Sequence, residues 1–129
     1  MKPRRLAPIL ALALAGCGQA TETPAPEMPG NQIATAPAAW RQCVMCHSTA
    51  PRKNGIGPSL AGIHGQPAAH EPSYAYSSAM RASGIVWDDA ALDAYLTNPR
   101  AVVPGTKMAF GGIADPAERA KLIAFLETL

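Results

Sequence analysis

The stretch RQCVMCHSTA, residues 41–50, decides the fold of this chain. It contains two of the three cysteines, Cys43 and Cys46, and a histidine, His47, follows them directly. On one helical turn these residues stand at i, i+3 and i+4, so their side chains share a face. A Cys-x-x-Cys pair is typical of redox dithiols, of zinc sites and of covalent haem attachment, and the rest of the chain has to decide among these three chemistries.

Two of these chemistries find little support elsewhere in the sequence. Zinc would need two more thiolate or imidazole ligands at a matching spacing, and neither the third cysteine nor the two other histidines supply such a pair. A thioredoxin-like dithiol belongs to a βαβ pattern, which the chain lacks. The adjacent histidine favours haem, because two thioethers can hold the porphyrin edge while the imidazole meets the iron. The motif therefore predicts one covalent haem c, bound through Cys43 and Cys46, with His47 as an iron ligand.

The N-terminus predicts export and lipid attachment. Residues 1–16 combine a basic start, an apolar run and small residues, which is typical of a secretory signal peptide and too short for a permanent membrane anchor. They lead into LAGC, residues 14–17, which resembles the lipobox of bacterial lipoproteins, where cleavage leaves the cysteine as the lipidated first residue. An ordinary signal peptide with a stray cysteine is the alternative. We expect Cys17 to carry the lipid and to hold the protein on the periplasmic side of a bacterial membrane.

Composition divides the remaining chain in two. Residues 17–37 are rich in Pro, Ala and Thr and predict an extended tether. Residues 38–129 are long enough for one small domain, which we expect to be monomeric. Removal of residues 1–16 takes away three of the eleven basic residues, so eight remain against nine acidic ones and the mature chain is nearly neutral. No basic stripe indicates a nucleic-acid partner.

Local signals in the domain are helical. Helices are expected over 38–47, over one or two turns of 74–83, over 89–98 with Asp88 as N-cap and Pro99 as terminator, and over 115–129 with Asp115 as N-cap. Residues 58–73 and 98–112 are expected to form loops, because glycine and proline interrupt them. No segment alternates as a strand would. The prediction is an all-α domain whose long loops wrap a cofactor.

The second axial ligand has several candidates. Haem iron held by one histidine takes Met, His or Lys at the other position, or leaves it open. The candidates are Met45, Met80, Met108, His64 and His70. Met45 lies between the cysteines and points off the haem-facing side, and Met80 fits core packing better. Met108 stands in PGTKMAF, residues 104–110, where a Pro-Gly turn can present a side chain inward.

Five stretches in order, CVMCH, GIGPSLAGIHG, YAYSSAMRASGIVW, YLTNPRAVVPGTKMAF and LIAFL, resemble the class I cytochromes c of the mitochondrial and bacterial photosynthetic type. The resemblance covers residues 40–129. It implies the class I cytochrome c fold, one covalent haem, and a single-electron carrier without enzymatic activity whose second iron ligand is the sulfur of Met108. The further haem-contacting residues that it implies are Pro58, bonded through its carbonyl to His47, Tyr76 and Trp87 at a propionate, and Tyr95 and Thr106 beside Met108.

The resemblance also implies redox partners. These would be a quinol-oxidising complex on one side and a terminal oxidase or another reductase on the other. Among the departures from the family pattern, Gln66 stands where an arginine usually faces a propionate, and Met80 replaces a usual asparagine. A haem subunit of a periplasmic oxidoreductase or a peroxidase-like enzyme is the alternative function, and it would require an open sixth position. A haem sensor would have to bind a gas at the ferrous iron.

Overall fold

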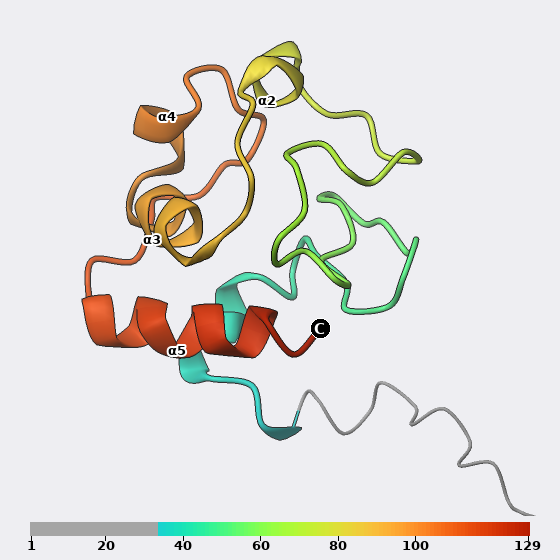
Figure 1. Ribbon diagram of the computed structural model, residues 1–129. Helices are drawn as coiled ribbons and strands as arrows, with labels where there is room; N and C mark the ends of the chain where they lie inside the picture. The colour runs from blue at the N-terminus through green and yellow to red at the C-terminus, as the bar shows by residue number, and fades with distance from the viewer. Residues whose placement is uncertain (1–33) are drawn as a thin grey trace, which may run out of the picture.

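The computed structural model describes residues 34–129 (Figure 1). The predicted signal peptide, Cys17 and most of the tether lie outside these residues. Within the described range the chain forms a 3₁₀ helix, η1 (Ala38–Gln42), and the helices α2 (Ser78–Ala82), α3 (Asp89–Thr97), α4 (Pro99–Val102) and α5 (Pro116–Leu126). This range contains no strand, only an isolated bridge between Pro67 and Val86. None of its helices is long and apolar enough to cross a membrane. The predicted all-α fold is confirmed.

The two longest helices begin at the predicted caps. The side chain of Asp88 accepts a hydrogen bond from the backbone N–H of Ala91 at 2.8 Å, and α3 begins at the next residue. Asp115 accepts in the same way from Ala117 at 2.8 Å, and Pro116 occupies the first position of α5. These bonds satisfy backbone donors that have no partner inside the helix. The caps that the sequence predicts therefore set where both helices start.

The segment that precedes the cysteine pair differs from its prediction. Instead of one helix as far as His47 it forms the 3₁₀ helix η1, which ends at Gln42, and a single helical turn follows. In that turn the N–H of Cys46 and that of His47 donate to the carbonyl of Cys43 at 3.0 and 2.8 Å. Short helical pieces often adopt the tighter 3₁₀ bonding. The shared face that the motif needs is therefore built by one turn rather than by a longer helix.

Pro99 was predicted to end a helix, and it also begins one. It is the first residue of α4, and the side chain of Asn98 accepts from the N–H of Ala101 at 3.2 Å as the cap of this short helix. Proline fits this position because its missing N–H would have no intrahelical partner there. The predicted loop 98–112 therefore contains one helical turn before the segment that carries Met108.

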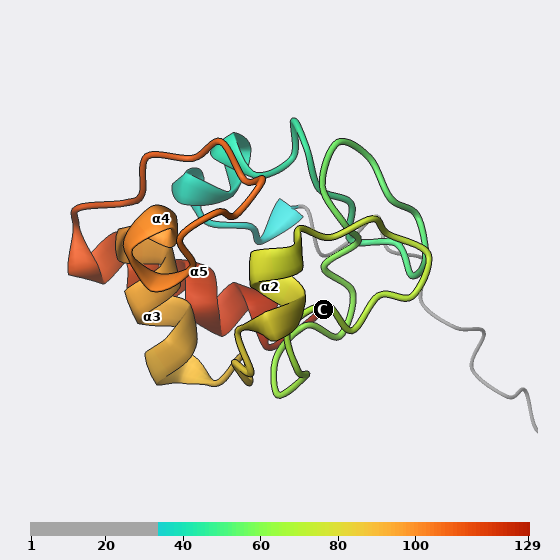
Figure 2. The same cartoon turned by 90° about the horizontal axis from the view of Figure 1, so that it is seen from above.

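The core forms where α5 packs against η1 and α3. Figure 1 shows α5 lying across η1 and beneath α3, and Figure 2 shows the same elements from above. The rings of Trp40 on η1 and Phe125 on α5 are 5.1 Å apart between centroids, and Leu122 is fully buried. The long loops 48–77 and 103–115 surround this helical base. The first and last helices of the domain thus meet through one aromatic pair.

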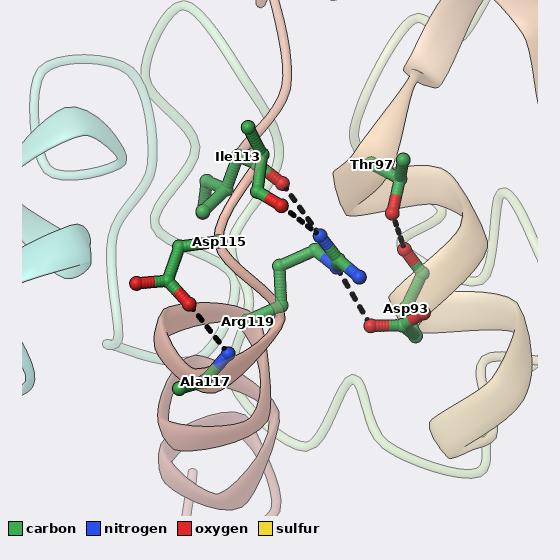
Figure 3. A network of polar contacts seen from close by, with 7 residues as sticks. Asp93, Thr97, Ile113, Asp115, Ala117 and Arg119 are labelled. Atoms are coloured by element: carbon green, nitrogen blue, oxygen red, sulfur yellow. Dashed lines mark hydrogen bonds and ion pairs between the residues drawn. The ribbon is translucent and has the colours of Figure 1, made fainter.

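Arg119 joins three segments at the start of α5, which the sequence alone did not indicate (Figure 3). Its Nε donates to Asp93 Oδ1 on α3 at 2.7 Å, and its Nη1 donates to the carbonyls of Ile113 and Ala114 at 2.8 and 2.9 Å. The arginine side chain is only 11% exposed, whereas that of Asp93 is 48% exposed. The guanidinium therefore ties α3 and the end of the 103–115 loop to α5.

Replacement of Arg119 by methionine should lower the free energy of unfolding by roughly 2–3 kcal/mol. The change keeps apolar bulk but leaves two backbone carbonyls and a carboxylate without their charged donor, and lost bonds of this kind cost about 1.5–3 kcal/mol. Denaturant unfolding of the haem-containing protein measures the loss. Lys121→Met is the matched control, because Lys121 on the same helix is 63% exposed and its hydrogen-bonded ion pair is with Glu118, three residues away. Equal losses in the two variants would contradict the role of Arg119.

Candidate haem site

One cavity of about 240 Å³ brings the predicted haem residues together. Its wall is formed by the motif turn, both long loops, α2, α3 and α5, and is mostly apolar. The sequence-predicted residues that line it are Cys43, Cys46, His47, Pro58, Tyr76, Trp87, Tyr95, Thr106 and Met108. Every residue that was predicted to contact the haem is therefore on this one wall, and none lies elsewhere in the described chain.

The apolar lining of the cavity fits a haem. Leu122 and Leu126 belong both to the buried core and to the cavity wall, so core packing needs an apolar occupant here. A flat apolar macrocycle that is fixed at two thiols meets that need.

The two motif cysteines are half-buried and form no disulfide with each other. Burial, with a smaller contribution from Cys46, raises the pKa of Cys43 to about 11. Reactive dithiols and zinc sites need thiolates, which a lowered pKa favours. Within residues 34–129, no set of three converging Cys, His, Asp or Glu donors includes either cysteine. The site therefore favours thioether attachment over the redox-dithiol and zinc alternatives.

His47 is oriented by a backbone carbonyl. Its Nδ1 lies 2.8 Å from the carbonyl oxygen of Pro58, which can only accept, so this nitrogen carries the proton. The lone pair of the imidazole is then on Nε2. Burial lowers the pKa of His47, and the bond to Pro58 partly offsets that effect. Burial thus favours the neutral imidazole, and the bond to Pro58 leaves Nε2 free, which is the form that binds a metal.

Gly57 leaves room for this ring, and sequence reasoning missed it. A Cβ at residue 57 would lie 2.4 Å from Cε1 and 2.7 Å from Nδ1 of His47. The N–H of Gly57 also donates to the carbonyl of Cys46 at 2.8 Å, which fixes the loop against the motif turn. The signal was visible in the GIGP stretch, residues 55–58, but a glycine in a loop does not reveal which side chain it faces.

A polar chain leads to Met108. The hydroxyls of Tyr95 and Thr106 lie 2.9 Å apart, and the N–H of Met108 donates to Thr106 Oγ1 at 3.3 Å. Burial raises the pKa of Tyr95, while the bond to Thr106 acts in the opposite direction, so the phenol stays protonated at neutral pH. Lys107 Nζ donates to the carbonyl of Ala75 at 3.0 Å and joins the two long loops. The Met108 segment is thus held from α3 and from the loop before α2.

The positions of the other candidate iron ligands exclude all but one of them from the cavity. Met45 is 76% exposed, and neither His64 nor His70 lines the cavity. Met80 is buried in the core, as predicted, but it also lines the cavity from α2. Two thioethers, those of Met80 and Met108, therefore remain on the wall.

Tyr76 and Trp87 are buried on the cavity wall. The ring of Trp87 packs edge-on against Tyr95, with centroids 4.9 Å apart, and its backbone N–H donates to the carbonyl of Gln66 at 2.9 Å. Gln66 itself is exposed and does not line the cavity. The backbone of Gln66 therefore holds Trp87 in place, whereas the side chain of Gln66 does not contact the cavity.

A hydrogen-bonded network holds the loop around the motif. The hydroxyl of buried Ser59 donates to the carbonyl of Ala50 at 2.7 Å, and Asn54 Oδ1 accepts from the N–H of Ser59 at 2.9 Å. Asn54 Nδ2 continues to Ser73 Oγ at 2.9 Å, and Ser73 donates to Glu71. These residues were not predicted, because their partners lie up to 19 positions away in the sequence.

Comparison with known proteins agrees with this site. The family model for cytochrome c matches residues 27–129. The chain is 50% identical over 90 residues to cytochrome c2 of Rhodomicrobium vannielii, covering 69% of this chain and 72% of the relative. It is also 50% identical over 95 residues to cytochrome c2 iso-1 of Magnetospirillum molischianum, covering 72% and 95%. Cytochrome cH from Methylobacterium extorquens superposes with a TM-score of 0.67 at 39% identity, over 78% of this chain and 97% of that one. The chain therefore belongs to the cytochrome c family, as an electron carrier whose haem c is attached through Cys43 and Cys46.

Proposed function

We propose that this protein is a lipid-anchored periplasmic cytochrome c that carries single electrons between membrane complexes, with His47 and Met108 as the axial ligands of its iron. The observation that carries the proposal is the shared cavity, where an oriented imidazole and a thioether from a different loop line the same wall as the cysteine pair. A redox titration that records the optical spectrum of both oxidation states tests it.

The haem, when bound, supplies a centre that accepts and releases one electron. The chain's own residues hold that centre in one environment. Pro58 keeps the proton of His47 on Nδ1, and Thr106 fixes the backbone of Met108. The apolar lining excludes water, and a neutral His/Met pair favours a relatively high potential. If His47 and Met108 both held the iron, no position on it would remain for a substrate, so we propose a carrier rather than a peroxidase-like enzyme or a gas sensor.

The partners that this function needs are redox proteins at the membrane. We propose a quinol-oxidising complex as donor and a terminal oxidase or another reductase as acceptor. Among the described residues, Lys107 is the one cationic side chain on the cavity wall, and the mature chain is nearly neutral. Steering by charge is therefore weak. A lipid on Cys17 and an extended tether of about 3.1 Å per residue would instead concentrate the protein beside its partners.

Removal of the anchor should slow electron delivery in membranes without changing the haem. We suggest exchanging residues 1–17 for an ordinary cleavable signal sequence. The midpoint potential should stay the same, because the exchange lies outside the domain, and turnover by membranes at equal cytochrome concentration should fall at least several-fold. Added salt should have little effect on the anchored form, because screening acts on charge steering. The control is the full chain matured in the same cells. Equal rates for the two forms, or steep salt quenching of both, would refute a kinetic role for the anchor.

A further inference from the structure

A second group of donor side chains converges on the surface, away from the haem cavity. His64 lies in the long loop, Asp89 is the first residue of α3, and Glu127 is the C-cap of α5. His64 Nε2 lies 2.7 Å from Asp89 Oδ1 and 3.8 Å from Glu127 Oε1, and the ligand atoms of all three residues are within 4.8 Å of one another. None of the three lines the cavity.

A simple ion pair explains only part of this arrangement. Nε2 carries at most one proton, and the 2.7 Å contact with Asp89 uses it. The 3.8 Å distance to Glu127 is too long for a hydrogen bond. Glu127 also stands at the C-terminus of α5, where the helix dipole disfavours a negative charge. The carboxylates of Asp89 and Glu127 thus both face Nε2 of His64. Glu127 also lies at the C-terminus of a helix, where the helix dipole favours a bound cation.

We propose that His64, Asp89 and Glu127 bind one divalent transition-metal ion of the zinc class. Zinc takes imidazole nitrogen and carboxylate oxygen at about 2.0–2.2 Å, so tetrahedral ligands lie roughly 3.3–3.6 Å apart. The distances from His64 Nε2, 2.7 Å to Asp89 and 3.8 Å to Glu127, lie on either side of that range. Small rotations of the three side chains, which are 34%, 71% and 45% exposed, bring both distances into it. The imidazole favours zinc over calcium and magnesium, which prefer oxygen ligands. Water would complete the coordination.

Binding at this site would join three segments that form the haem cavity. Ile63, next to His64, lines the cavity, as do Leu92 on α3 and Leu126 on α5. A metal that binds only the folded arrangement stabilises it by mass action. The metal therefore holds the loop, the start of α3 and the end of α5 together, and it does not contact the haem.

The test uses the haem-containing protein and zinc as the probe. Equilibrium dialysis with metal analysis measures the bound zinc, and thermal unfolding with and without zinc measures its effect on the fold. The wild type should bind one equivalent, and zinc should raise its unfolding temperature. His64→Gln and Glu127→Gln should each weaken binding at least tenfold and remove the thermal shift. His70→Gln is the matched control, because His70 lies outside the cluster, and it should behave as the wild type.

The variants keep the test decisive. The altered side chains are outside the cavity, so an unchanged optical spectrum verifies each fold, and Glu127→Gln carries the test should His64→Gln not accumulate. Equal zinc affinity of wild type and both cluster variants would overturn the proposal, because the metal would then bind elsewhere. So would the lack of any zinc uptake by the wild type at submillimolar concentration, which would leave only a hydrogen-bonded ion pair.

Discussion

Replacing Met108 by alanine should abolish the red absorption band that is typical of methionine-ligated ferric haem and should lower the midpoint potential by about 0.1 V or more. Axial ligands set haem potentials over a range of about 0.8 V, and a thioether favours the ferrous state. A shift of 0.1 V corresponds to about 2.3 kcal/mol for one electron. Optical redox titration of wild type and variant measures both effects.

Met80→Leu is the matched control for this change. Met80 is the other thioether on the cavity wall, but it is buried in the core cluster and its N–H is bonded to Ser77 Oγ at 3.0 Å as part of the α2 cap. Leucine preserves its bulk, so the band and the potential should remain. Loss of the band in Met80→Leu together with its survival in Met108→Ala would reverse the assignment of the second ligand.

Local patterns were enough to predict α2, α3 and α5, because their signals act over few residues. Asp88 and Asp115 cap α3 and α5 as predicted, and the apolar positions of α5 face the core. The sequence did not predict the 3₁₀ form of η1, because a short helix exchanges i+4 for i+3 bonds at little cost. It also missed α4, because a proline after a helix is compatible both with a loop and with the first turn of another helix.

The motif predicted Cys43, Cys46 and His47, the family resemblance implied the other haem-lining residues, and the structure brings all of them together on one wall. What could not be predicted depends on distant partners. Arg119 is buried because Asp93 and two carbonyls reach it, and a charged residue on a helix gives no sign of such contacts. The His64 cluster likewise unites three segments that are far apart in the sequence. The lipidation of Cys17 and the roles of the individual site residues stay predictions.

Gly57→Ala should disturb the haem site directly. The added Cβ would overlap the imidazole of His47, at 2.4 Å from Cε1, so either the ring or the loop has to move. The ring cannot turn away without breaking the bond from Nδ1 to the Pro58 carbonyl, and the loop is fixed by the bond from Gly57 to Cys46. Overpacking of this kind costs about 1–3 kcal/mol, and a displaced imidazole is a poorer ligand. We expect a reduced yield of haem-containing protein, lower stability and an altered spectrum.

Gly111→Ala separates this clash from the general effect of replacing a glycine. Gly111 lies in the other long loop, near Met108 in the sequence, and a Cβ there meets no atom within 4 Å. It also lacks the positive φ of its neighbour Gly112, so alanine introduces no backbone strain at this position. The control should therefore match the wild type in haem yield, potential and unfolding midpoint, all measured on proteins matured in the same cells. If Gly57→Ala behaved like Gly111→Ala, the imidazole would have freedom that its bond to Pro58 denies it, and the orientation of His47 would have to come from the iron rather than from the chain.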